Sequence, residues 1–425
     1  MNRFSHGIVK RVNAYTQRLL EHDLSSKREK VLAQGSHYDL VDASEVGTCV
    51  ATIKESTIES VQPMPIYGVL KSGELQLQSP ALHCYRFEHA SITAFADYIM
   101  LPNHTAVWVK RDLPIFTKDV PMDVGLLSYD TSSIIVKTSP KTVKLGKVFS
   151  MCGVYSNVWS HFMIQYVCKL YSLLQLPKEI RENLTILVPE YNDGHIKCVF
   201  DSFVSNYLPE VSVRILKGDE VACCDELYVI ESTTAMIDNE KYVSYVDMVI
   251  PQYVSELLKK YMVPQLPSES LSERIFLVRR GEWRNLLNSE EIEAFFSSLG
   301  FRMVEPHKLS YQEKVSLFHY AKEVVGPYSS GFSNTIFCQP GTKVLILSNL
   351  QRAFEPFLTF YRQYFDLDLL CVTGADEQQE NSHSPYRIPL ERVKAAYYEL
   401  SNTNIQVSQA DFIQSAVGFP NLSVL

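Results

Sequence analysis

The sequence lacks the features that define several common classes of protein. No stretch of its 425 residues approaches the roughly 18 consecutive apolar residues that a membrane-spanning helix needs. The chain does not open with an apolar signal core followed by small residues, so we expect a cytoplasmic protein. It has no internal repeat and no low-complexity tract. Hydrophobic residues make up 46%, which excludes disorder as the main description, and the length predicts two to four domains.

The sequence also lacks the cysteine and histidine spacings that mark disulfide frameworks and metal sites. Its nine cysteines are scattered, and only Cys223 and Cys224 are close together. An odd number without CxxC spacing fits neither a disulfide framework nor a zinc cluster, and the HExxH motif is missing. We therefore expect reduced, mostly buried thiols and no bound metal or other cofactor.

Acidic residues outnumber basic ones, 48 against 40, which gives a net charge of −8. A nucleic-acid-binding protein needs a strong positive field, so no nucleic-acid partner is expected. Residues 1–35 depart from this average, because they are basic and place apolar side chains at helical spacing (Val9, Val12, Tyr15 and Leu19). Such a helix can contact an anionic membrane surface peripherally, or it can be an ordinary solvated helix packed on the next domain.

The pattern of apolar and polar residues changes near Val148. Residues 45–145 are rich in polar–apolar alternation, for example over 74–78 and 106–110, which is typical of strands. Residues 158–174 carry apolar side chains at a 3.6-residue period and predict a helix. Beyond it the pattern predicts strands over 184–188, 211–215 and 226–230 and a helix over 195–205.

A second alternating block follows a linker predicted around 250–270, where Pro251, Pro264 and Pro267 gather. Strands are predicted over 274–278, 301–304, 323–325 and 343–347. Asn288 can cap the first helix of the block, and Ser310 with Glu313 forms a capping box for a second helix. Two such blocks predict two facing α/β domains of the nucleotide-binding type, with a cleft between them.

The segment 326–334 is the first candidate binding site, because ligands bind beyond the carboxyl ends of strands in an open parallel sheet. Its glycines allow close backbone approach, its serines add hydroxyl donors, and the following helix directs free N–H groups toward an anion. A diphosphate would fit, while the plain alternative is a tight turn with serine caps. The candidates here are Gly326, Tyr328, Ser329, Ser330, Gly331 and Asn334.

Three arginines follow the strand predicted over 274–278, at the same edge of the sheet. Arg279, Arg280 and Arg284 could clamp phosphate oxygens, because each guanidinium donates two aligned hydrogen bonds. The alternative is a solvated basic loop. Strand geometry places Arg279 best, and Asn288 joins the set, although capping can be its whole purpose.

The third candidate site lies in the preceding block. His161 stands in the first turn of the helix over 158–174, roughly opposite its apolar stripe, and could act as a general base. A packing role is the alternative for a lone histidine. Glu190 and Asp193 follow the strand over 184–188 and are rival carboxylate bases.

These segments together resemble glycosyltransferase family 61. Residues 325–342 (VGPYSSGFSN…FCQPGT) are similar to its signature loop, and the upstream strand with Arg279, Arg284 and Asn288 is similar to a second element. Residues 157–162 (NVWSHF) are similar to its Asn-Tyr-x-His-Trp element at the head of a long helix. The resemblance spans about 150–350 in the family's order.

The resemblance implies an inverting, metal-independent enzyme with two facing Rossmann-type domains, the GT-B architecture. A C-terminal domain over 263–380 would hold a nucleotide-sugar donor, usually a UDP-sugar, and a domain over 41–262 the saccharide acceptor. Outside the resemblance, we expect a helical segment over 1–40 as part of an N-terminal extension and helices over 381–425 that pack back across the domains. The bacterial type that builds capsules and surface polysaccharides fits best. In this interpretation Arg279, Arg284 and the 326–334 loop neutralise the departing UDP, and His161, or else Glu190, deprotonates the acceptor.

Three positions depart from the family pattern. Tyr328 stands where the loop usually has histidine, Ser289 where glutamate usually follows the asparagine, and Ile346 where the final strand usually has an acidic residue. These changes keep a second interpretation open, a non-catalytic scaffold subunit that binds nucleotide-sugars in a polysaccharide assembly complex. The sequence Asp366-Leu-Asp368 spells the acidic triplet of some metal-dependent sugar transferases, but we expect a solvated loop there.

Overall fold

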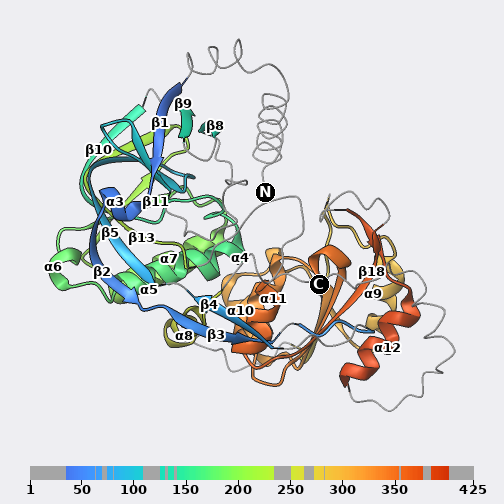
Figure 1. Ribbon diagram of the computed structural model, residues 1–425. Helices are drawn as coiled ribbons and strands as arrows, with labels where there is room; N and C mark the ends of the chain where they lie inside the picture. The colour runs from blue at the N-terminus through green and yellow to red at the C-terminus, as the bar shows by residue number, and fades with distance from the viewer. Residues whose placement is uncertain are drawn as a thin grey trace, which may run out of the picture. The chain divides into compact units, whose positions relative to one another are not determined.

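The computed structural model describes residues 35–62, 64–68, 74–79, 81–108, 125–129, 133–137, 141–233, 250–262, 272–281, 283–353, 356–376 and 384–401 (Figure 1). The described chain divides into two compact units. The first contains the described residues up to Glu59, those of Leu77–Asn239, and those of Val246–Val263; the second contains the rest. The basic helix predicted over 1–35 lies outside the described residues, apart from Gly35, which begins a strand.

The first unit is built on one mixed sheet of eleven strands, in the order β12-β11-β10-β13-β5-β6-β7-β1-β9-β8 with β2 beside β5. Four strands at one end, β10 to β13, run parallel, and β5 joins β13 in antiparallel fashion. The predicted strand-rich region before residue 145 therefore continues the sheet of the α/β block. The strands are β1 (Gly35–Val41), β2 (Thr48–Lys54), β5 (Leu82–Thr93), β6 (Tyr98–Met100), β7 (Thr105–Trp108), β8 (Leu126–Tyr129), β9 (Ser133–Lys137), β10 (Lys141–Ser150), β11 (Thr185–Pro189), β12 (Ser212–Leu216) and β13 (Glu220–Ile230).

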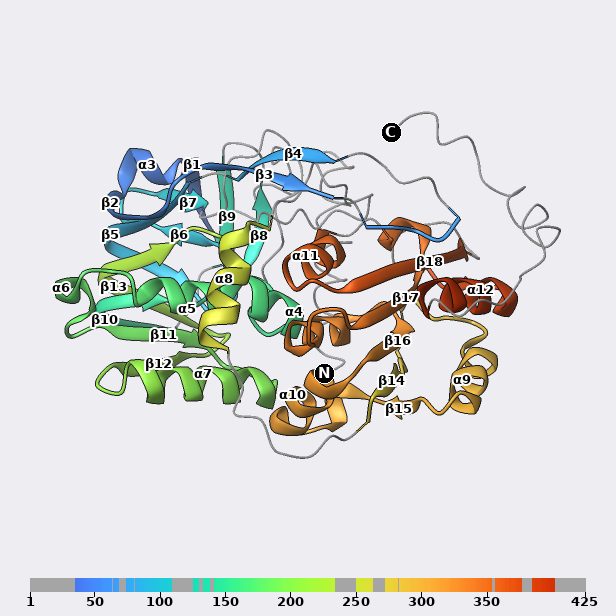
Figure 2. The ribbon, with the colours of Figure 1, turned by 90° about the horizontal axis from the view of Figure 1, so that it is seen from below.

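The helices of this unit follow the parallel strands, as the alternation predicts. Figures 1 and 2 show α5 (Val167–Leu173) and α7 (Gly194–Tyr207) alongside β10–β12. The helix predicted over 158–174 is real but irregular: α4 (Trp159–His161) passes into a π-helical turn, Phe162–Tyr166, before α5. All residues from Phe162 to Leu173 are buried, so the segment is a core helix with no solvated face. The unit also contains α3 (Ala43–Val46) and α6 (Lys178–Arg181).

Part of the predicted linker around 250–270 is a helix, so that prediction was wrong for residues 252–261. They form α8 (Gln252–Tyr261), and Pro251 precedes it in an extended conformation that suits a helix start. The helix packs on α5: Ser172 and Tyr253 share a hydrogen bond of 3.1 Å between their hydroxyl oxygens, and the rings of Tyr171 and Tyr261 stack. Pro251 therefore begins a packed helix at this point in the chain, and Pro264 and Pro267 lie outside the described residues.

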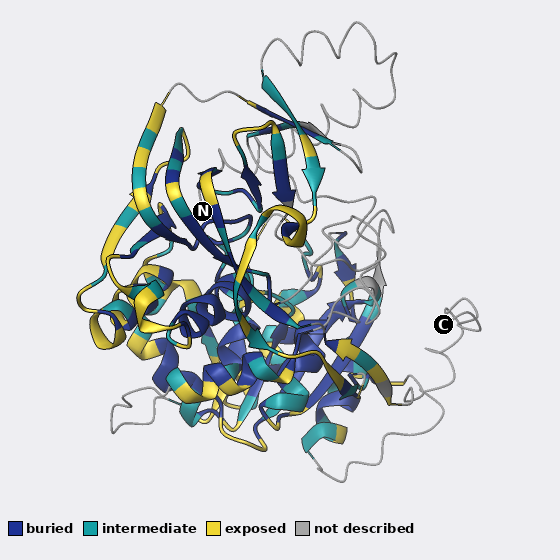
Figure 3. Cartoon of the chain, turned by 60° about the vertical axis from the view of Figure 1, so that its left-hand side comes forward, coloured by how far each residue is buried: buried dark blue, intermediate teal, exposed yellow. Residues whose placement is uncertain are grey.

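The second unit has a six-stranded sheet in the order β15-β14-β16-β17-β18-β19, parallel except for the last strand. Its core strands are almost wholly buried (Figure 3). The strands are β14 (Arg274–Leu277), β15 (Arg302–Val304), β16 (Glu323–Pro327), β17 (Lys343–Asn349), β18 (Asp368–Asp376) and β19 (Tyr386–Arg387). A separate ribbon of β3 (Thr57–Val61) and β4 (Leu75–Ser79) spans the chain positions at which the units divide.

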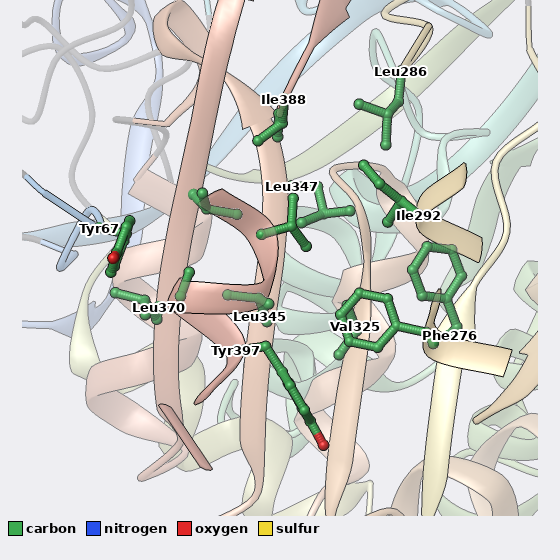
Figure 4. Packing of buried hydrophobic residues seen from close by; sticks show 14 of the residues in the cluster. Tyr67, Phe276, Leu286, Ile292, Val325, Leu345, Leu347, Leu370, Ile388 and Tyr397 are labelled. Atoms are coloured by element: carbon green, nitrogen blue, oxygen red, sulfur yellow. The ribbon is translucent and has the colours of Figure 1, made fainter. Parts of the chain in front are cut away.

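One face of this sheet is covered by α9 (Ser289–Ser298) and α12 (Leu390–Ser401), whose apolar side chains pack on Phe276, Val325 and Leu345 (Figure 4). Helices α10 (Tyr311–Tyr320) and α11 (Pro356–Tyr364) are on the other side of the sheet in Figure 2. The predicted capping box is confirmed, since Ser310 Oγ accepts from the Glu313 N–H and the Glu313 carboxylate accepts from the Ser310 N–H. The unit is thus a three-layer α/β fold.

Candidate functional site

The order of the parallel strands in the second unit fixes where a ligand would bind. In chain order the strands β14, β15, β16, β17 and β18 are arranged 2-1-3-4-5, so the direction of winding reverses between β14 and β16. Ligands of open α/β sheets bind outside the carboxyl ends of the strands at such a reversal. The segments that leave these two ends are 278–288 and 328–331. They are the segments that the sequence singles out.

Two arginines beyond the end of β14 are half-buried and have no partner of opposite charge among the described residues. The Nε atoms of Arg279 and Arg284 are both inaccessible, and neither donates a hydrogen bond within the described part of the chain. Among the described residues no aspartate or glutamate pairs with either guanidinium. Burial, together with the positive charges of Arg284 and Arg352, lowers the pKa of Arg279 to about 10. Arg279 Nη2 donates to the Trp283 carbonyl oxygen at 2.7 Å, but that neutral group does not compensate the charge, so the two arginines are a candidate site for an anion.

Arg280, between them in sequence, has a different role. Its two terminal nitrogens donate to the two carboxylate oxygens of Glu293 in α9, each at 2.6 Å. This fork-to-fork pair raises the pKa of Arg280 and holds its side chain toward α9. Of the three arginines predicted to clamp phosphate, only Arg279 and Arg284 are therefore left to do so.

Tyr328 directly follows β16 and lies beside one of these arginines. The Arg284 guanidinium carbon is 5.8 Å from the centroid of the Tyr328 ring, a cation–π arrangement. Burial raises the pKa of the phenol, whereas the nearby Arg352 and Arg284 oppose that shift. The phenol thus stays neutral at physiological pH and can donate one hydrogen bond.

Sequence reasoning missed Arg352. It lies in the short 3₁₀ helix Leu350–Arg352 directly after β17, beside β16 in the sheet, and its charge acts on both Arg279 and Tyr328. The carboxyl-end rule could have found it, because β17 was predicted, but the predicted strand stopped at residue 347. Three adjacent strands, β14, β16 and β17, therefore each send polar side chains to one edge.

The predicted loop over 326–334 is shorter than expected, because a 3₁₀ helix already begins at Ser330 (Ser330–Phe337). Gly326 lies inside β16, and a Cβ there would meet the Leu277 carbonyl oxygen at 2.6 Å, so this glycine serves the close packing of strands. Ser329 caps the helix by accepting from the Gly331 N–H at 3.3 Å. Asn334 is buried and donates to the Gly331 carbonyl at 2.7 Å, which shapes the loop from within. Ser330 is exposed.

Asn288 is at the N-cap position of α9 as predicted, yet its side chain makes no capping hydrogen bond. Its amide instead donates to the Ile388 carbonyl at 2.9 Å and accepts from the Ile388 N–H at 3.4 Å. The neighbouring backbone continues this contact, because the Leu287 N–H donates to the Tyr386 carbonyl and the Tyr386 N–H donates to the Asn285 carbonyl, both at 2.9 Å. These hydrogen bonds hold the segment that carries Arg279 and Arg284 against β19, the strand before α12.

The parallel strands of the first unit also reverse their direction of winding. Its parallel strands β10, β11, β12 and β13 are arranged 3-2-1-4, so winding reverses between β10 and β13. His161 follows the end of β10 and is half-buried, stacked on Tyr155 with ring centroids 4.7 Å apart. Its Nδ1 is 3.1 Å from the Gln165 side-chain oxygen, which fixes the ring orientation. Tyr155 itself has a left-handed backbone (φ 65°), a strained conformation of the kind found at functional sites.

The two rival carboxylates follow β11, at the same edge. Glu190 is exposed, and its backbone carbonyl accepts from the Asn157 side chain at 3.1 Å, which links this edge to the segment before α4. Asp193 caps α7 through the His195 N–H at 2.8 Å and also contacts the His195 ring. Asp193 is therefore occupied as a helix cap, whereas Glu190 directs its carboxylate to solvent.

Residues 159–345 match the family model Glycosyltransferase 61. The chain has a glycosyltransferase family 61 domain. The matched region runs from Trp159 in α4 to Leu345 in β17 and includes both candidate sites except Tyr155 and Arg352. The predicted family is thereby confirmed, and the protein is a glycosyltransferase. A search of curated proteins found no match to the sequence.

The acidic triplet of this glycosyltransferase lies away from the arginines. Asp368 begins β18, and Asp366 precedes it in an exposed turn, so both lie at the amino end of a parallel strand. The arginines lie at the carboxyl ends, on the opposite edge of that sheet. Within the described residues no group of three or more His, Cys, Asp and Glu side chains is arranged to hold a metal ion. No described helix has the length and apolar character needed to cross a membrane.

Proposed function

We propose that this glycosyltransferase moves a sugar from a nucleotide-sugar, of the UDP class, to a hydroxyl of a saccharide acceptor, with inversion at the anomeric carbon. The second unit would hold the donor and the first the acceptor, in the GT-B arrangement of two facing domains. Synthesis of a surface polysaccharide such as a capsule is the process that this reaction would serve.

The observation that carries the proposal is the half-buried pair Arg279 and Arg284, whose Nε atoms are inaccessible and which has no described carboxylate partner at the carboxyl end of β14. A diphosphate supplies two adjacent negative groups and would satisfy both guanidinium groups. Tyr328 would add a neutral hydrogen-bond donor beside Arg284. The same groups would then stabilise the negative charge that grows on the diphosphate as it leaves.

The reaction can be written with named groups. His161 Nε2, the ring nitrogen opposite the one near Gln165, would take the proton of the acceptor hydroxyl. The acceptor oxygen would attack the anomeric carbon of the donor sugar from the side opposite the diphosphate. As the new C–O bond forms, the bond to the diphosphate oxygen breaks, and its electron pair leaves with the diphosphate.

Metal independence is part of the proposal, because Arg279, Arg284 and Arg352 can supply the positive charge that a divalent cation supplies elsewhere. We also propose a cytoplasmic enzyme. Peripheral membrane contact through the basic residues 1–35 stays a prediction, since that segment lies outside the described residues.

The test is a screen of UDP-sugars with the full chain, with and without EDTA, scored for slow donor hydrolysis and for transfer to oligosaccharides. Release of UDP that persists in EDTA supports the proposal, and NMR of the first product must show an inverted anomeric configuration. Binding without hydrolysis or transfer would instead support the scaffold interpretation. If no nucleotide binds, both interpretations fail.

A further inference from the structure

A pocket of about 620 Å³ opens in the first unit, away from the predicted acceptor edge. Its floor crosses adjacent strands of the large sheet: Lys144 of β10 is paired with Cys223 of β13, Cys223 with Ser91 of β5, and Ser91 with Met100 of β6. Residues paired in this way point to the same face of a sheet. The volume falls within the roughly 300–1,000 Å³ of small-molecule sites.

The hollow exists because a glycine occupies β10. Gly146 is two residues after Lys144 and so lies on the same face, and a Cβ built on it would meet no atom within 4 Å. It is four residues before Ser150, where β10 ends, or about 13 Å along the strand at 3.3 Å per residue. The pocket is therefore separate from the edge that carries His161.

The walls combine rings with hydrogen-bonding groups. Tyr38 of β1 and His104 line one side with ring centroids 5.7 Å apart, and His89 lines another. His104 Nδ1 is 3.3 Å from the His37 carbonyl oxygen, so it donates there and leaves Nε2 as an acceptor. His89 and His104 both have left-handed backbones, with φ of 52° and 59°, strain that often marks functional positions.

The charges around the pocket balance. Lys144 and Asp225 are exposed at its rim, and neither forms a hydrogen bond or ion pair within the described part of the chain. One cation and one anion with two imidazoles do not select a diphosphate, in contrast to the arginine pair of the other unit. Apolar contacts from Met100 and Leu101, rings, and both donors and acceptors suit a neutral polyhydroxylated ring, whose C–H face is apolar and whose hydroxyls are polar.

We propose that this pocket is a second, non-catalytic saccharide site that holds a neutral sugar unit of an acceptor chain. This proposal takes only the class of ligand, a saccharide, from the proposed function. Binding in the pocket can be measured without any catalytic turnover. Such a site would anchor the acceptor at a distance from the reacting end, so that longer acceptors bind more tightly than single sugars.

The test is saturation-transfer NMR on the full chain with neutral glucose, galactose, mannose and N-acetylglucosamine and with oligosaccharides built from them. We expect at least one to bind, with at least tenfold weaker binding in Gly146→Leu, which fills the hollow, and in Tyr38→Ala. Binding should stay within twofold in Arg279→Ala and in Gly194→Ala, a glycine with open space outside the pocket. Thermal unfolding of each variant shows that it is folded.

Two results would overturn the proposal: no neutral saccharide binds the wild-type chain at tens of millimolar, or one binds and Gly146→Leu and Tyr38→Ala leave its affinity unchanged. Loss of donor hydrolysis is a separate readout. If the chain binds saccharide in this pocket but hydrolyses no UDP-sugar, the further site stands and the proposed function fails.

Discussion

The guanidinium of Arg284 lies 5.8 Å from the centre of the Tyr328 ring, and this contact joins the ends of two adjacent strands, β14 and β16. Arg284 reaches that position from a left-handed backbone, with φ of 55°. The folded state thus has both local backbone strain and a half-buried cation without a described carboxylate partner at one point. A bound anion would relieve the second cost, which is why we place the donor diphosphate here.

Replacing His161 tests the acceptor side. We expect His161→Ala to lower kcat by about 10²–10⁴, the usual contribution of a general base, with donor and acceptor saturating. His307→Ala, whose side chain is 72% exposed in the second unit, is the matched control and should keep normal turnover. If His161→Ala retains near wild-type kcat, the base assignment fails, and Glu190→Gln is the next variant to measure.

The half-buried charge of Arg279 should reduce stability in the absence of donor. Burial puts the folded pKa of Arg279 at about 10, below its ordinary 12.5, so the charged form is disfavoured in the folded state. That cost is fully present below pH 10 and is relieved only as the pH rises from about 10 toward 12.5. Arg279→Met should therefore raise the unfolding free energy without ligand, by an amount that stays constant from pH 6 to 9.

Chemical denaturation of both proteins over that pH range checks this prediction. Pyrophosphate should stabilise the wild type and leave Arg279→Met unchanged, because a ligand that binds only the folded state shifts unfolding. A variant less stable than the wild type would show that the hydrogen bond from Arg279 Nη2 to the Trp283 carbonyl oxygen outweighs the cost of the uncompensated charge, contrary to this prediction.

Asn288 distinguishes a structural clamp from a ligand contact. Asn288→Ala leaves the buried N–H and carbonyl of Ile388 unsatisfied and should lower the unfolding free energy by about 1–3 kcal/mol. Leu287→Ala, at a neighbouring position that is 45% exposed, should change little. A rise in donor KM without any loss of stability would instead place Asn288 in contact with the donor.

Gly326 tests the packing of the donor edge. In Gly326→Ala the new Cβ would meet the Leu277 carbonyl oxygen at 2.6 Å and the Leu277 Cβ at 2.9 Å. We expect a loss of about 1–3 kcal/mol, as in other overpacked sites. Gly281→Ala, where the nearest atom is Arg279 Nη2 at 3.5 Å, should unfold like the wild type. Equal stability of the two variants would contradict the assigned role of Gly326.

The sequence predicts well what depends on local pattern. The alternation of strands and helices, the Ser310 capping box and the carboxyl-end position of Arg279 follow from spacing and residue type, and the structure has all three. The family follows too, because its three elements lie in order along the chain.

The sequence predicts poorly what depends on partners far away. The antiparallel pairing of β5 with β13 and the hydrogen bonds between Asn288 and Ile388 join segments about 100 or more residues apart, and no local signal encodes either. The π-helical turn at Phe162–Tyr166 and the helix α8 are settled by packing on neighbouring elements. The pocket beside Gly146 likewise needs strands β1, β5, β6, β10 and β13 to be placed before it can be seen.

The central claim is that Arg284 binds and stabilises the leaving diphosphate, and one paired measurement tests it most directly. Calorimetric UDP binding and single-turnover transfer are measured for the wild type, Arg284→Ala and Arg280→Ala. We predict that Arg284→Ala lowers the rate by about 10²–10³ and weakens UDP binding, the effect of removing one donor to a growing negative charge. Arg280→Ala loses its pair with Glu293 and a 3.4 Å hydrogen bond to the Arg279 carbonyl oxygen, and it should match the wild type. Equal losses in both variants, or none in Arg284→Ala, would contradict the account.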